Sequence, residues 1–376
     1  MRKKYSSQVF KQLGESVMPI VAYYAFPDSV EFEGEVFPST KTDKEYFLTK
    51  EAGVNVTLLM NDPVKKKPES VKKSLELCER YGMLYLLHSD DMIERANWRV
   101  ERDGTEGNEE ACKLLNINRF KEFFDEYIHH PACCGWCLWD EPMKDDMEYL
   151  GKLIRAWKEY SKAVGEENKT YYVNLLPSSK WSGTTVETYG EYIQDAVEKA
   201  GLEYLCYDMY PFLYPARLAS LIPEAKRGIS PGMFNLACQI RHWAKKYDMP
   251  WHAFVQMGGN WSEEPDNVGV RRPTPIEVLW EVNVFLAFGA KGIHYFSWSQ
   301  PISFLKYRKA GGDTGAFDAY GQPTDLYWAA KNANRQIMAV DEYLMAAKSE
   351  KIITVGPLPT GIIETPILYL PQPSKK

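Results

Sequence analysis

Several features that would assign the chain to a common class are absent from its sequence. No run of about 18 apolar residues occurs, so no membrane span is predicted. The net charge is −6, and the longest basic run, Lys65-Lys66-Lys67, lies in a predicted loop before a helix. Nucleic-acid binding needs clusters of phosphate-neutralising cations. The sequence therefore predicts neither a membrane nor a nucleic-acid partner.

The N-terminus is basic, but no apolar run follows Met1-Arg2-Lys3-Lys4, so it is not an intact secretory signal. A secreted or periplasmic protein whose signal had been removed would look the same. The localisation stays open, and the composition is that of a soluble protein. The sequence does not indicate an oligomeric state.

Signatures of several enzyme chemistries are also missing. There is no GxSxG elbow of a serine hydrolase, and no Gly-rich phosphate loop follows any predicted strand. No His, Asp and Glu set has metal-ligand spacing. The seven cysteines are odd in number, and Cys134 and Cys137 lie in a predicted buried strand, which favours buried thiols over a metal or redox site. No metal and no cofactor are expected.

The feature that dominates the chain is an alternation of short apolar runs and amphipathic helical patterns. Most of the runs are continuously apolar, which is typical of parallel strands covered on both faces. The predicted strands cover residues 18–26, 54–60, 83–88, 134–139, 170–176, 202–210, 250–257 and 290–298. The predicted helices cover residues 43–51, 68–81, 118–129, 145–164, 190–200, 229–247, 275–288 and 325–346. Eight such units predict an α/β fold, a closed (β/α)8 TIM barrel, with a doubly wound sheet as the alternative.

The expected organisation is an N-terminal extension (residues 1–17), the barrel (18–348) and a short β-like tail (349–376). The tail either begins a lost β-domain or closes the bottom of the barrel. Long loops follow predicted strands at residues 27–41, 89–115, 258–273 and 300–324. Long loops at the C-terminal face of such a barrel usually build the active site.

Two carboxylates stand at the end of the fourth predicted strand, where Asp140 and Glu141 follow Trp139. A carboxyl group at such a position is partly desolvated, which raises its pKa and favours a general acid near neutral pH. The alternative interpretation is that the pair caps the next helix or forms ion pairs. Asp208, at the end of the sixth predicted strand, is a candidate base or substrate anchor, or a turn residue before Pro211.

An amide takes the corresponding position at the end of the seventh predicted strand, where Gln256 emerges from an apolar run. Its amide group suits a sugar hydroxyl, and Trp261 is expected to stack on a sugar ring. The chain also has 11 Trp, 24 Tyr and 16 Phe, more than a core alone requires, and aromatic faces pack well on sugar rings. The remaining residues expected to bind substrate are Trp139, Asp140, Tyr24, His88, Asn174, Tyr207, Tyr210 and Trp298.

These motifs resemble those of clan A TIM-barrel glycoside hydrolases, in a β-galactosidase-like, uncharacterised branch. The segments that carry the resemblance are Trp139-Asp140-Glu141-Pro142, Tyr207-Asp208-Met209-Tyr210-Pro211 and the turn of residues 315–324 before a helix. The resemblance covers most of residues 18–346. It implies a retaining mechanism, with an acid/base Glu preceded by Asn after strand four and a nucleophilic Glu after strand seven.

Glu141 matches the acid/base, but Asp140 stands where Asn is usual and Gln256 where the nucleophile is expected. The first hypothesis is a glycoside hydrolase acting on an oligo- or polysaccharide, with Glu141 as general acid and Asp208 as base or anchor. An inverting pair of this kind would be separated by roughly 6.5–9.5 Å, against about 5–5.5 Å in a retaining pair. The second hypothesis is a non-catalytic carbohydrate-binding barrel. A lyase or isomerase is less well supported, because neither a metal set nor a rim Lys base is present.

Overall fold

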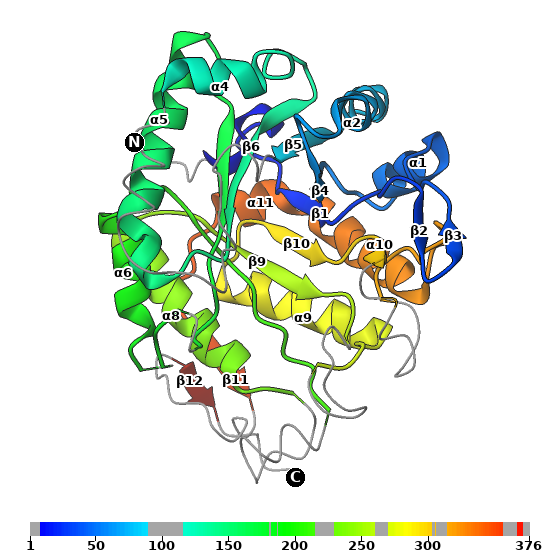
Figure 1. Ribbon diagram of the computed structural model, residues 1–376. Coiled ribbons are helices and arrows are strands. Elements are labelled where there is room, and N and C mark those ends of the chain that lie inside the picture. The colour runs from blue at the N-terminus through cyan, green and yellow to red at the C-terminus, as the bar shows by residue number, and fades with distance from the viewer. Residues whose placement is uncertain are drawn as a thin grey trace.

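The computed structural model describes residues 8–88, 116–179, 182–185, 187–214, 229–259, 270–302, 305, 314–355 and 367–370. Its centre is one eight-stranded sheet in the order β7-β6-β5-β4-β1-β10-β9-β8 (Figure 1). The strands are β1 (Ile20–Tyr23), β4 (Val56–Pro63), β5 (Leu84–His88), β6 (Cys133–Asp140), β7 (Thr170–Asn174), β8 (Leu205–Tyr207), β9 (Trp251–Gln256) and β10 (Ile293–Phe296). Every paired strand in this sheet is parallel to its neighbour.

The two ends of the sheet meet and close the barrel. Leu175, just beyond β7, forms a parallel bridge with Tyr207 of β8, and its N–H donates to the Cys206 carbonyl oxygen at 2.8 Å. The (β/α)8 TIM barrel predicted from the sequence is thereby confirmed. Because all strands run the same way, their carboxyl ends lie on one face of the barrel.

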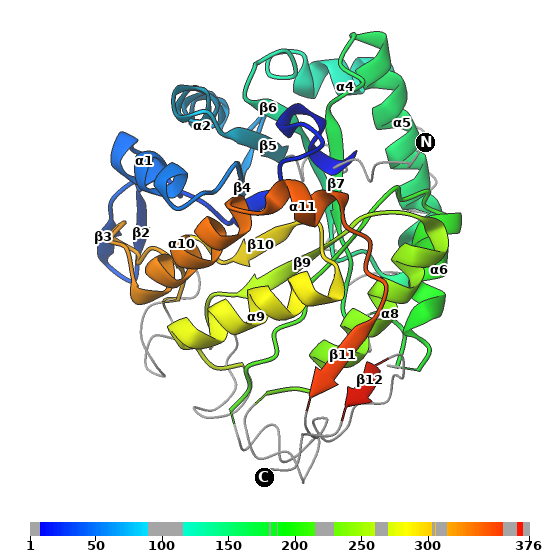
Figure 2. The ribbon, with the colours of Figure 1, turned by 180° about the vertical axis from the view of Figure 1, so that it is seen from behind.

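Helices connect successive strands and cover the outside of the barrel (Figures 1 and 2). They are α1 (Asp43–Glu51), α2 (Pro68–Tyr81), α4 (Ile117–Phe124), α5 (Met147–Ala163), α6 (Tyr189–Glu198), α8 (Gly232–Tyr247), α9 (Pro275–Phe288) and α10 (Asp325–Met338). A 3-10 turn, η3 (Lys144–Asp146), leads into α5. The helix predicted over residues 325–346 is divided, since a separate helix α11 (Asp341–Ala346) follows α10.

Local capping explains where several helices begin and end. At α9, Thr274 accepts from the Glu277 backbone N–H and the Glu277 side chain accepts from the Thr274 N–H, while Pro275 occupies the first turn. Gly289 ends the helix at φ 98°, in the left-handed region that glycine adopts easily. The helix accordingly spans the residues predicted for it.

Smaller elements surround the barrel. The loop after β1 contains the antiparallel hairpin β2 (Val30–Phe32) and β3 (Glu35–Phe37). The tail forms a parallel pair, β11 (Ile352–Val355) and β12 (Ile367–Leu370), which lies beside α8 (Figure 2). At the N-terminus, the 3-10 segment η1 (Gln8–Leu13) packs against β7.

Aromatic rings fill both core layers. Inside the barrel, Phe10 of η1 stacks on Tyr172 and on His252, each at 6.4 Å between ring centroids. Outside it, Trp136 of β6 lies 5.6 Å from Trp157 of α5. Strand alternation produces this division, because successive side chains point to opposite faces.

A glycine sets the approach of β6 to β7. Gly135 has φ 140°, and a Cβ atom placed there would lie 2.0 Å from the Thr170 carbonyl oxygen. No other residue fits without moving one of the two strands. The pairing of β5 with β6 also shifts register next to Gly135. This close contact positions the last residues of β6, which carry the candidate catalytic groups.

Candidate active site

Three acidic side chains from two strand ends meet at the C-terminal face of the barrel. Asp140 ends β6, Glu141 follows it, and Asp208 follows β8. The charges of Glu141 and Asp140 and a side-chain hydrogen bond with Glu141 all act on Asp208. The structure therefore brings together the two residues predicted to be catalytic.

Asp208 is the buried member of this carboxylate cluster (Asp140, Glu141 and Asp208), whereas the other two are half-buried. Its side chain is 5% exposed. Burial raises the pKa of Asp208 well above its usual value, and the neighbouring Glu141 and Asp140 carboxylates raise it further. A buried carboxyl group beside other carboxylates favours its protonated form, because a further negative charge there would be poorly solvated and repelled by its neighbours. Near neutral pH, Asp208 is thus the protonated partner in its hydrogen bond with Glu141.

The two carboxyl groups lie close enough for each to act on the charge of the other. Carboxyl pairs are separated by about 5–5.5 Å in retaining glycosidases and by roughly 6.5–9.5 Å in inverting ones. The inverting separation stays a prediction for the substrate-bound protein. Without substrate, a proton held by one carboxyl group turns a repulsive pair into an attractive one.

Asn174, predicted as a substrate-binding residue, supports the cluster from β7. Its side-chain Nδ2 donates to Asp140 Oδ1 at 3.1 Å, and its carbonyl oxygen accepts from the Glu141 N–H at 2.9 Å. Glu141 has φ 56°, a left-handed conformation that is uncommon outside glycine. The two contacts with Asn174 hold the backbone in this turn, which directs the Glu141 side chain away from the strand's regular alternation.

Aromatic residues stand around the carboxylates. The Phe296 ring lies 5.8 Å from the Tyr23 ring and 5.7 Å from the Tyr210 ring. Burial, together with the charge of Asp140, raises the pKa of Tyr23 well above its usual value. Burial and the charge of Asp208 do the same for Tyr210. Both hydroxyls therefore remain protonated donors beside the acidic cluster.

Two buried oxygens in this region, Asp208 Oδ1 and Asn174 Oδ1, have no hydrogen-bond partner among the described residues. Buried polar atoms are almost always paired in folded proteins. Unpaired acceptors next to a carboxylate cluster are positions where a bound hydroxyl or water completes the hydrogen bonding.

A tyrosine from α6 joins the loop that carries Glu141 to the loop that follows Asn174, and sequence reasoning did not identify it. The Tyr192 hydroxyl donates to the Pro142 carbonyl oxygen at 2.6 Å and accepts from the Leu176 N–H at 3.2 Å. It therefore joins the loop after β6 to the loop after β7. Nothing in the local pattern of α6 distinguishes Tyr192 from an ordinary core residue.

Gln256 lies at the end of β9, and its side-chain amide forms hydrogen bonds with backbone groups. Nε2 donates to the carbonyl oxygens of Gly258 at 2.9 Å and Arg271 at 2.6 Å, and Oε1 accepts from the Phe212 N–H at 2.9 Å. The side chain is fully buried. It acts as a clamp between the loops after β8 and β9, so the predicted contact with a sugar hydroxyl is not what the structure shows.

Behind Gln256 lies a further carboxyl group, from Glu281 of α9. Its Oε2 accepts from the Gln256 N–H at 3.0 Å, and burial raises its pKa well above the usual value. Glu281 packs on the helix side of the strand, outside the barrel interior. It does not replace the carboxylate that the family resemblance implies at the end of β9.

Three aromatic residues expected to contact substrate lie in the layer between strands and helices. Trp139 packs on Tyr149 of α5 at 5.8 Å, and Tyr207 lies 6.3 Å from Phe285 of α9. Both precede an acidic residue of the cluster, and strand alternation directs them outward. Trp298 is fully buried, and its Nε1 donates to Thr49 of α1 at 2.8 Å. All three side chains therefore pack against helices in this structure, and their contact with substrate stays a prediction.

The remaining predicted residues are distributed around the rim. His88 ends β5, buried beside Cys137 of β6. Tyr24 is half-buried and lines a separate hollow of about 260 Å³ with Leu59 and Phe32. Trp261 lies outside the described residues.

The described part of the chain contains no group of three His, Cys, Asp or Glu side chains arranged to hold a metal ion. Its cysteines are all buried free thiols. No helix in the same part is both long and apolar enough to cross a bilayer.

Comparison with solved structures identifies TIM-barrel glycoside hydrolases as structural neighbours, in agreement with the resemblance seen in the motifs. β-Galactosidase from the psychrophilic Marinomonas ef1 has 12% sequence identity and a TM-score of 0.56, over 90% of this chain and 63% of that chain. GH5_18 from Bifidobacterium longum subsp. longum also has 12% identity and a TM-score of 0.56, over 90% and 82% of the two chains. A putative α-L-fucosidase from Bacteroides thetaiotaomicron has 12% identity and a TM-score of 0.53, over 85% and 96%.

These likenesses establish the fold. The chain spans less than two thirds of the β-galactosidase and 51% of the length of Ruminococcus gnavus β-glucuronidase, which it matches with a TM-score of 0.50. No protein-family description matches the sequence. No curated protein matches it in sequence either.

Proposed function

We propose that the protein is a glycoside hydrolase whose reaction is carried by the Glu141–Asp208 pair. The observation that carries the proposal is the position of these two carboxyl groups beside each other at the C-terminal face of the barrel, where burial and the Glu141 charge raise the pKa of Asp208. Glycoside hydrolysis needs one carboxyl group that donates a proton and a second that acts in the ionised state. A coupled pair with one proton supplies both forms near neutral pH.

The proposed reaction begins when the proton held by Asp208 passes to Glu141 through their hydrogen bond, and a sugar then enters between the two carboxyl groups. Glu141 then donates the proton to the glycosidic oxygen as the bond from that oxygen to the anomeric carbon breaks. Asp208, ionised, accepts a proton from the water that forms the new bond to the anomeric carbon. Asp140 lies beside both groups, where its negative charge stabilises the developing oxocarbenium ion.

The clamp formed by Gln256 supports a single displacement by water. An amide cannot form the ester of a covalent glycosyl-enzyme, and this amide is in addition held by backbone groups on both sides. The proposal therefore favours inversion of the anomeric configuration. It requires Glu141 and Asp208 to move apart by several ångström when substrate binds.

The test compares Glu141→Gln with Glu148→Gln on a panel of aryl glycosides and oligosaccharides. Glu148 is an exposed residue in the first turn of α5 and provides a matched charge change nearby. We expect Glu141→Gln to lose about 10²- to 10⁴-fold in kcat, while Glu148→Gln keeps the wild-type rate. Equal rates in both variants would remove Glu141 from the mechanism. Proton NMR of the first anomer released distinguishes inversion from retention.

A second candidate function is a non-catalytic carbohydrate-binding barrel, which the missing carboxylate at the end of β9 favours. It predicts that wild-type protein binds oligosaccharides in calorimetry but releases no sugar over prolonged incubation. Binding without turnover in the wild type would select this function over hydrolysis.

A further inference from the structure

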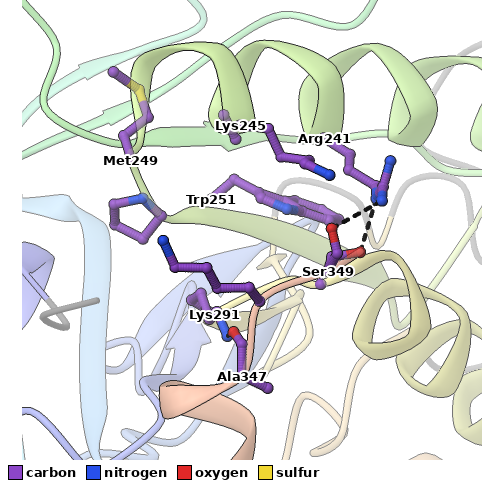
Figure 3. A pocket seen from close by; sticks show the side chains of 11 residues that line it. Arg241, Lys245, Met249, Trp251, Lys291, Ala347 and Ser349 are labelled. Atoms are coloured by element: carbon purple, nitrogen blue, oxygen red, sulfur yellow. Dashed lines mark hydrogen bonds between the residues drawn. The ribbon is translucent and has the colours of Figure 1, made fainter. Parts of the chain in front are cut away.

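A small hollow lies at the opposite end of the barrel from the carboxylates. Figure 3 shows the side chains that line it. It is bounded by the C-terminal half of α8, the residues that start β9 and precede β10, and the segment after α11. Trp251, the first residue of β9, contributes to its wall. Because the strands are parallel, their first residues lie on the bottom face, so this hollow is separate from the proposed active site.

Arg241 of α8 is a buried cation in this hollow, at 5% exposure. Its Nε donates to Ser349 Oγ at 2.7 Å and its Nη2 to the Ser349 carbonyl oxygen at 2.9 Å (Figure 3). A guanidinium group has five N–H donors. These two bonds leave both N–H groups of Nη1 and one of Nη2 without a hydrogen-bond partner among the described residues. In that part of the chain, Arg241 also forms no ion pair.

Lys291 supplies a second buried cation, at 6% exposure. Its Nζ donates to the carbonyl oxygens of Ala347, at 2.6 Å, and Leu344. Burial lowers the pKa of Lys291 to about 8. The carbonyl groups at the end of α11 favour a cation, but they carry only partial charge.

The surroundings of the hollow add positive charge. Lys245 and Lys348 also line it, and both are exposed. No acidic side chain is among the described residues that line it. Two carboxylates lie near the hollow but outside its lining. Asp248 Oδ1 lies 3.8 Å from Lys348 Nζ, and the charge of Glu350 acts on Arg241. Buried charges are costly without a counter-ion.

We propose that this hollow binds a small tetrahedral oxyanion, inorganic phosphate or sulfate, between Arg241, Lys245 and Lys291. Its volume is about 30 Å³. One water needs roughly 10–15 Å³ by the same kind of measure, so the space holds about two waters or the oxygens of one such anion. The anion accepts from the remaining guanidinium donors and neutralises the lysines. This inference does not depend on the proposed hydrolase activity.

Binding is measured by calorimetry with inorganic phosphate, in a chloride buffer at constant ionic strength and pH 7. We expect one saturable site of millimolar affinity in the wild type. Arg241→Gln should weaken the affinity by about tenfold or more, and Lys245→Gln by about threefold. The Lys245 side chain is exposed, so its variant should fold even if Arg241→Gln does not. Affinity should also fall above about pH 8, as Lys291 loses its proton.

The matched control is Lys246→Gln. Lys246 is adjacent in sequence, but its Nζ lies over the Trp243 ring at 4.1 Å, outside the hollow. This variant should bind phosphate like the wild type. A non-saturable stabilisation by phosphate, equal in all variants, would be a general salt effect and would overturn the site. Glycerol phosphate binding at least tenfold more tightly than phosphate would overturn the assignment to a free anion.

Discussion

The carboxyl groups of Glu141 and Asp208 are joined by a hydrogen bond, although β7 separates their strands in the barrel. The contact is possible because Glu141 leaves its strand in a left-handed turn that Asn174 holds in place. Two side chains that would repel each other when both ionised are thus attached through one proton. This arrangement makes both the stability and the activity of the protein sensitive to pH.

Asp208→Asn should make the protein more stable at neutral pH. The folded state raises the pKa of Asp208, so it holds a proton that the unfolded chain has lost above about pH 4. The stability that Asp208 contributes is fully present below the pKa of the unfolded state, and it is lost as the pH rises toward the pKa of the folded state. The variant should match the wild type near pH 4 and exceed it increasingly at higher pH, by about 1.4 kcal/mol per pH unit in that window.

Denaturant unfolding at several pH values measures this difference, with Asp145→Asn as the control at an exposed position. If the difference in unfolding free energy between Asp208→Asn and the wild type stays constant from pH 4 to pH 8, the pKa of Asp208 is not the one that folding raises. Activity gives a second readout, because the variant should lose turnover while it gains stability.

Gln256→Glu should not create a working nucleophile. The substituted carboxylate cannot donate to the Gly258 and Arg271 carbonyl oxygens, and it lies beside Glu281, which is already a buried carboxyl. We expect a loss of about 2–4 kcal/mol in unfolding free energy and no gain in turnover. Gln336→Glu, on the exposed face of α10, is the matched control. A stable, more active Gln256→Glu enzyme would contradict the clamp assigned to Gln256.

Tyr192→Phe tests the connection between the loops after β6 and β7, which hold Glu141 in place. The change removes the hydrogen bonds to Pro142 and Leu176 while it keeps the ring. We expect about 1–2 kcal/mol of destabilisation, and a fall in kcat larger than any change in KM. Tyr343→Phe, at 74% exposure on α11, should change neither. Unchanged kinetics in Tyr192→Phe would show that the loops are held without this hydroxyl.

The buried His252–His294 pair should make the fold sensitive to acid. Burial lowers the pKa of His252 to about 3, and its Nδ1 lies 3.0 Å from His294 Nε2. In the unfolded chain His252 takes up a proton near pH 6.5, whereas in the folded protein it stays neutral. The free energy of unfolding therefore falls as the pH decreases from about 6.5 to about 3. His252→Gln should flatten this decline, whereas exposed His242→Gln should follow the wild type. Parallel acid-unfolding curves for all three proteins would refute the prediction.

The parts of the fold that the sequence predicts best depend on local chemistry. The bounds of α9 follow from Thr274, Pro275 and Gly289, which act within their own turns. The division between α10 and α11 has no glycine or proline to mark it, and the helical pattern runs through it. The barrel itself was predictable because each strand–helix unit repeats the same pattern.

The site was predictable only in its carboxylates. Strand position alone brings Glu141 and Asp208 to one face, and alternation explains why Trp139 and Tyr207 point away from it. The clamp made by Gln256 depends on the backbone of residues as distant as Phe212, which no local pattern reveals. Likewise, Tyr192 reaches Pro142 across 50 residues.

Phe10 has a consequence for the order in which the molecule is assembled. Its ring lies against Tyr172 and His252, so the lower opening of the barrel is closed by residues that are far apart along the chain. The segment η1 can complete these contacts only after β7 and β9 are in place. Contacts between residues so far apart along the chain slow folding. When the barrel unfolds, detachment of η1 is an early step that exposes its lower opening.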